Sequence, residues 1–159
     1  MSSEQVTPTW ENYIEVPKTQ AKEALETLEA AMPTGLPPAV RDLILTRAGQ
    51  VTEPEGIRIS DRRESAFGPV LFAGGEKGHA RYSYSVEQKI SMLENWSEVP
   101  FKQLRLFPFA TNTGHGVFCV DFREEPLSIV FVDMDYDLEE VGSITPVAQS
   151  IDELWSRLC

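Results

Sequence analysis

The 159-residue chain has only two cysteines and two histidines, and it has no long hydrophobic run. Its first ten residues are polar, and nowhere do about 18 apolar residues follow one another, so we expect neither a signal peptide nor a membrane span. Cys119 and Cys159 make a poor disulfide framework, which predicts two free thiols in a reducing cytoplasm. A chain of this length can bury the core of one domain without crosslinks.

Basic residues are also scarce, with 14 Lys and Arg against 25 Asp and Glu and a formal net charge of −11. This sign of charge repels phosphate backbones and anionic lipid, and it disfavours direct binding to nucleic acid or to a membrane. The acidic excess is concentrated between Asp121 and Glu140, where Arg123 is the single base. Two interpretations are open: a solvated face that keeps the protein soluble, or a docking surface for a basic partner. The acids of this stretch are Asp121, Glu124, Glu125, Asp133, Asp135, Asp137, Glu139 and Glu140.

Complete catalytic and metal-binding motifs are missing. The apolar run before Asp133 and Asp135 is typical of haloacid-dehalogenase-like phosphotransferases, but too little chain follows for the further strands, Lys and Asp that this chemistry needs. Asp133, Asp135 and Asp137 also match the first ligands of a calcium loop, yet Leu138 and Ile144 stand where that loop requires Gly and Glu. The glycines at 74–78 have the wrong spacing for a phosphate loop, and there is no Gly-x-Ser-x-Gly elbow. We therefore expect no enzyme activity, no metal site and no cofactor.

Two apolar runs dominate what is present. Residues 116–122 and 128–133 are rich in β-branched and aromatic side chains, and the short acidic turn between them predicts a hairpin of adjacent strands. Neither run alternates between apolar and polar residues, so we expect both strands to lie inside a sheet that helices cover on both faces. In an antiparallel hairpin, Asp121 lies at the turn end and Asp133 at the opposite end. The acids should then form two patches.

The flanks carry helical patterns. Apolar residues at intervals of three and four predict one helix from Pro17 to Met32 and a second from Pro38 to a cap at Gly49. Capping boxes at 85–88 and 150–153 predict the starts of two further helices, the last one reaching residue 158. Residues 105–110 and 144–148 are candidate strands, and Pro108 indicates an edge strand or a bulge. Residues 50–80 are harder to interpret, with a candidate strand at 56–60, a charged turn at 61–64 and a short apolar segment at 68–73.

The order of these elements defines an α+β protein, because regular strand–helix alternation is missing. We expect a loose lead-in over residues 1–10 and a single domain over residues 11–159. The order and spacing resemble the SUKH superfamily, and more narrowly its SMI1/KNR4-like branch. The resemblance covers residues 11–158 and rests on the two N-terminal helices with Leu36-Pro37-Pro38 between them, Pro108-Phe109-Ala110, the hairpin, and Ile144–Ala148 before the last helix.

The resemblance implies a compact domain with a mixed β-sheet wrapped by helices and no catalytic activity. Bacterial members are mostly immunity proteins that bind polymorphic toxins, often nucleases or nucleic-acid deaminases, whereas fungal members are signalling scaffolds. One departure is Ala48-Gly49-Gln50, where members often carry Asn-Gly-Gly.

The acidic charge and the resemblance together favour a cytoplasmic bacterial immunity protein. It would bind one cognate toxin, a basic one by the charge argument, and occlude its active site without any nucleophile. The expected partner-binding residues are Asp133, Asp135, Asp137, Glu139 and Glu140 in one patch, and Asp121, Glu124 and Glu125 in the other. The alternative is a non-catalytic intracellular scaffold or regulatory module that binds a peptide or a host-cell protein. The oligomeric state stays open.

Overall fold

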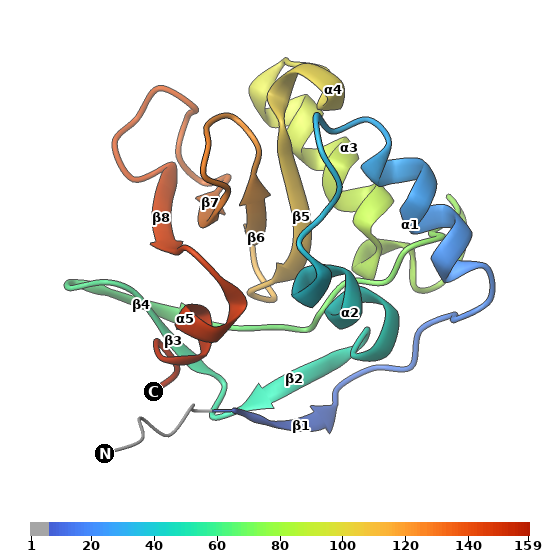
Figure 1. The fold of residues 1–159 in the computed structure, drawn as a ribbon, viewed down its shortest axis with the longest axis horizontal. Coiled ribbons are helices and arrows are strands. Elements are labelled where there is room, and N and C mark those ends of the chain that lie inside the picture. Colours follow the sequence, from blue (N-terminus) through green and yellow to red (C-terminus); the bar gives the residue numbers. More distant parts are fainter. Residues whose placement is uncertain (1–6) are drawn as a thin grey trace.

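The computed structural model describes residues 7–159, and a four-stranded sheet forms its centre (Figure 1). The strand order is β5 (Leu106–Thr111), β6 (Gly116–Asp121), β7 (Ser128–Asp133) and β8 (Ile144–Ala148). The predicted hairpin is confirmed, since Gly116 pairs with Asp133 and Asp121 with Ser128. The α+β class is confirmed as well. The sheet is antiparallel and not mixed, because turns and loops without a crossover helix join its consecutive strands.

Both faces of this sheet are buried, as expected. Along β6, Phe118 and Val120 belong to a larger core, whereas Val117 and Cys119 belong to a smaller core on the other face. The larger core includes side chains of α1 (Ala21–Glu29), α2 (Pro38–Thr46) and α5 (Ile151–Trp155). The smaller core includes side chains of α3 (Val86–Ser97) and α4 (Phe101–Leu104). A strand packed on both sides needs no polar row, which explains its uninterrupted apolar sequence.

The two N-terminal helices are shorter than their sequence patterns predict. The α1 helix ends at Glu29, three residues before Met32, and the Glu29 carboxylate accepts a hydrogen bond from the Leu36 backbone N–H at 2.9 Å. Glu29 also pairs with Arg41 of α2, so one buried carboxylate holds the connection between the helices. The α2 helix ends at Thr46. Gly49 follows with a φ of 80°, and a Cβ there would lie 2.2 Å from the Ile14 carbonyl oxygen, so glycine is required.

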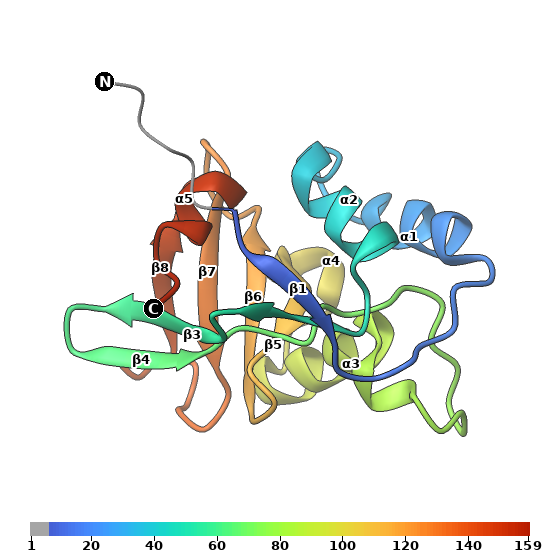
Figure 2. The ribbon, with the colours of Figure 1, turned by 90° about the horizontal axis from the view of Figure 1, so that it is seen from below.

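Residues 50–66 contribute three strands to two strand pairs, which Figure 2 shows in front of the central sheet. β2 (Gln50–Glu53) pairs with β1 (Thr9–Asn12), and β3 (Gly56–Ser60) pairs with β4 (Arg63–Ala66). The candidate strand at 56–60 is therefore confirmed. The expected lead-in at 1–10 includes residues 1–6, which lie outside the described residues, and residues 9 and 10, which belong to β1. The domain boundary at residue 11 stays a prediction.

The segment 68–73 lies along β5 and covers the edge of the central sheet. The Leu71 N–H donates to the Phe109 carbonyl at 2.9 Å, and Val70 bridges to Ala110. β5 is thus the last strand of its four-stranded sheet, and its register shifts between Pro108 and Ala110. Pro108 predicted an edge strand or a bulge, because proline cannot donate a hydrogen bond to a neighbouring strand, and both are present.

Both predicted capping residues cap their helices. A short 3₁₀ helix, η1 (Tyr82–Tyr84), leads into α3, where the Ser85 hydroxyl accepts a hydrogen bond from the Gln88 N–H at 3.1 Å. The Ser150 hydroxyl accepts one from the Glu153 N–H, also at 3.1 Å. The α5 helix ends at Trp155, short of residue 158. Both cysteines are free thiols, and no helix within residues 7–159 is long and apolar enough to cross a membrane.

Candidate partner-binding site

The structure separates the predicted acids into two groups at opposite ends of the β6–β7 hairpin. One group lies on the connection between β7 and β8, and we call residues 134–142 the acidic loop. The other lies at the turn between β6 and β7. The expectation of two patches is therefore confirmed.

Asp133 begins the first group but is not presented to solvent. It is 7% exposed, and its carboxylate forms an ion pair with Arg63 of β4. The same carboxylate accepts a hydrogen bond from the Asp135 N–H at 3.0 Å. Asp133 is thus a support for the acidic loop, because both of its oxygens are engaged within the protein.

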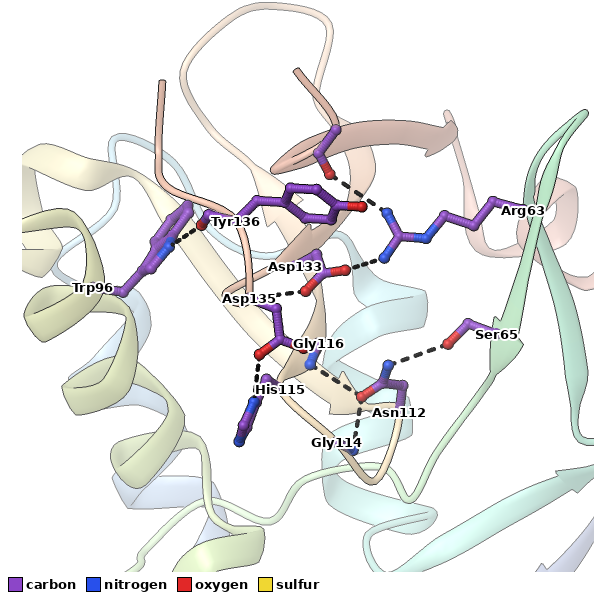
Figure 3. Close-up of polar contacts among 11 residues, drawn as sticks. Arg63, Ser65, Trp96, Asn112, Gly114, His115, Gly116, Asp133, Asp135 and Tyr136 are labelled. Carbon is purple, nitrogen blue, oxygen red and sulfur yellow. Dashed lines mark hydrogen bonds and ion pairs between the residues drawn. The ribbon is translucent and has the colours of Figure 1, made fainter. Parts of the chain in front are cut away.

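Arg63 contacts Asp133, directly before the acidic loop, and Tyr136 and Gly142 within it (Figure 3). Besides pairing with Asp133, the guanidinium donates to the Gly142 carbonyl at 3.5 Å. It also lies 5.7 Å from the ring centroid of Tyr136 and 5.2 Å from that of Phe131. A cation over an aromatic ring is attracted to its face, so these contacts add to the ion pair.

Further hydrogen bonds hold the acidic loop from other elements. Trp96 of α3 donates its indole N–H to the Tyr136 carbonyl at 2.6 Å, and the Ser143 hydroxyl donates to the Leu138 carbonyl at 2.9 Å. The Nδ1 atom of His115, in the β5–β6 turn, lies 2.6 Å from a carboxylate oxygen of Asp135. The loop therefore has a defined conformation before any partner arrives, which reduces the ordering cost of binding.

The acidic loop exposes both charged and apolar side chains. Four of its carboxylates are exposed, those of Asp135, Asp137, Glu139 and Glu140. Tyr136 is 40% exposed and Val141 is 99% exposed, and Tyr13 is the one other exposed large hydrophobic residue within 7–159. Our sequence reasoning missed both of these apolar residues and Arg63. The sequence signal for exposure of Val141 was its position between two acidic residues and Gly142.

The second group carries less unpaired negative charge in the folded protein than its sequence suggests. Asp121 is 7% exposed, and the Arg123 side chain binds it through two hydrogen bonds of 2.9 Å. The hydrogen bonds to Asp121 raise the pKa of Arg123. Lys102, Gln103 and Arg105 line one hollow with Arg123. Three cations thus accompany the three carboxylates of this group, and only Glu124 and Glu125 are exposed acids here.

Two of the three aspartates of the possible calcium loop are engaged with other side chains. Asp133 pairs with Arg63, and Asp135 lies against His115. Within residues 7–159, no group of three or more His, Cys, Asp or Glu side chains is arranged to hold a metal ion.

The fold and the loop define a class of protein: a single α+β domain whose sheet is covered on both faces and whose acidic loop is held in place. The model of the SMI1 / KNR4 family (SUKH-1) matches residues 21–157, and the chain belongs to this family. The resemblance noted in the sequence is therefore confirmed. No curated protein and no solved structure matches the chain. Membership is consistent with a role as an immunity protein.

Proposed function

We propose that this protein is a bacterial immunity protein that binds a cognate toxin with a basic surface and occludes its active site. The observation that carries the proposal is the acidic loop, which presents four exposed carboxylates in a conformation held by Arg63 and Trp96. Toxins that act on nucleic acids need positively charged clefts to bind phosphates, and an acidic surface complements such a cleft.

This mechanism uses charge and shape, and no bond is made or broken. Complementary charge accelerates the encounter of two proteins, and a loop that is already ordered loses little entropy when they dock. Within the predicted set we assign partner contact to Asp135, Asp137, Glu139 and Glu140. We assign supporting roles to Asp133 and Asp121, because both are buried and paired with arginines.

The test is co-expression with the product of the neighbouring gene, as the candidate toxin. We expect the two proteins to co-purify as a complex and this protein to restore growth of bacteria that express the toxin. A toxin that remains lethal and does not co-purify would contradict the proposal.

The alternative, a scaffold or regulatory module, is supported by a different surface. An apolar hollow lies between the start of α2, the β6–β7 turn and the start of α5, with Pro37, Leu127 and Ile151 among its lining residues. One apolar side chain of a peptide from a host-cell protein would fit there. If this alternative is correct, Leu127→Glu should abolish peptide binding, and the unaltered protein should not rescue bacteria from a toxin.

A further inference from the structure

The acidic loop forms one wall of a groove whose other wall carries positive charge. Glu140 and Val141 line the groove from the loop side, and Arg123 lines it from the hairpin turn. Val99, Leu104 and Ile144 also line it. The groove is therefore apolar between two walls of opposite charge.

The apolar part of the groove is continuous with the smaller core. Leu104 belongs to this core, and Val99 and Ile144 pack against it while remaining partly exposed. An apolar side chain placed here would extend an existing packed cluster and lose contact with water, which is favourable. Val141 adds an aliphatic side chain at the rim that is 99% exposed, so no residue within 7–159 covers it.

The positive wall extends beyond Arg123. Gln103 and Arg123 line both this groove and the adjacent hollow that Lys102 and Arg105 also line. Arg123 is engaged with Asp121, but the side chains of Lys102 and Arg105 form no hydrogen bond or ion pair with any residue in 7–159. Two unpaired cations thus stand beside the groove in a protein whose net charge is −11.

We propose that this polarised groove binds a segment of a protein partner in which an apolar side chain lies between basic and acidic residues. The basic residues face the acidic loop, and the acidic residues face Lys102 and Arg105. Opposite charges on the two walls fix the direction of the bound segment, because the reversed direction places like charges together. The inference rests on the proposed function, and it adds that the interface is not uniformly acidic.

The decisive experiment reverses the charge of the positive wall. The probe is the toxin that co-purifies with this protein, inactivated in its catalytic residue, and its affinity is measured by calorimetry. The double variant Lys102→Glu/Arg105→Glu makes this protein more acidic. A polarised groove predicts binding weakened by about tenfold or more, as for loss of a well-placed interface contact. A uniformly acidic interface predicts tighter binding and faster association.

A second variant tests the apolar contact. Val141→Ser changes a side chain that is 99% exposed, so the fold should be unaffected and the melting temperature unchanged. We expect affinity to fall by roughly fivefold or more, because the partner loses apolar contact at the rim. Hydrogen exchange should also show protection of residues 99–105 and 138–144 in the complex.

The outcomes separate the two proposals. Unchanged or tighter binding by the double variant, or unchanged binding by Val141→Ser, overturns the polarised groove while leaving the immunity function intact. Absence of any complex with the unaltered protein overturns the immunity function, and the groove proposal with it.

Discussion

Replacing Arg63 with methionine tests whether β4 holds the acidic loop. The substitution keeps an apolar stem near the rings of Phe131 and Tyr136 but removes the charge that pairs with Asp133 and the donor to Gly142. The Arg63 side chain is 32% exposed and that of Asp133 is 11% exposed, so the pair lies between a surface ion pair and a buried one. Removing one partner of a buried pair costs about 3–5 kcal/mol, and an exposed pair contributes below about 1 kcal/mol.

We therefore expect Arg63→Met to lower the free energy of unfolding by about 2 kcal/mol. In a domain of this size that corresponds to a decrease of roughly 4–8 °C in melting temperature. Urea denaturation measures the first quantity and calorimetry the second. NMR relaxation of residues 134–142 should show increased backbone motion. The matched control is Arg58→Met, because Arg58 is an exposed residue of β3 whose side chain has no ion pair or hydrogen bond within residues 7–159.

A second substitution separates the loss of the pair from the loss of Arg63 packing. Adding Asp133→Asn to Arg63→Met removes the buried unpaired carboxylate, so the double variant should be more stable than Arg63→Met alone. If Arg63→Met matches the Arg58→Met control in stability and in loop motion, the proposed anchoring of the loop is wrong.

Two further predictions concern other buried groups. Burial alone would raise the pKa of Glu29, but hydrogen bonds from Arg41 and from the Leu36 N–H outweigh it and lower the pKa below its ordinary value of 4.5. The stabilising contribution of Glu29 is therefore complete above pH 4.5 and is lost as the pH falls through the lowered pKa. Glu29→Gln should be less stable than the unaltered protein at pH 7, and this difference should shrink in acid. Urea titrations at several pH values measure it. Burial raises the pKa of the Cys119 thiol, whereas Cys159 is exposed. A thiol reagent should therefore modify one cysteine per native chain and two in denaturant. Modification of both cysteines in the native protein would contradict the buried position of Cys119.

Local sequence patterns predicted the parts of the fold that local interactions determine. The hairpin follows from two apolar runs and a short turn, and the starts of α3 and α5 follow from serine residues that bond the helix N–H groups three residues later. Residues 50–80 were less predictable, because their pairing depends on distant partners. β2 pairs with residues 9–12, and the segment 68–73 is held by β5, and neither relation leaves a periodic pattern in the segment itself.

The candidate site was predictable in its charge and not in its geometry. The sequence shows the cluster of acids, but the burial of Asp133 depends on Arg63, which lies 70 positions earlier in the chain. The pairing of Asp121 is more local, since Arg123 follows two residues later, yet the exposed Lys102 and Arg105 join it only in the folded protein. Counting charges along the sequence therefore overstated the acidity of the hairpin turn.

The most direct test of the immunity proposal compares charge reversal at the two ends of the hairpin. Asp135→Lys/Asp137→Lys alters the acidic loop, and Glu124→Lys/Glu125→Lys makes the same change in net charge at the other end, again at exposed residues. The measurement is the affinity of each variant for the toxin that co-purifies with the unaltered protein, at low and at physiological salt. The account predicts that the loop variant loses about tenfold or more in affinity, while the control variant stays near the unaltered protein. Equal affinities for the two variants would contradict the acidic loop as the toxin-binding surface.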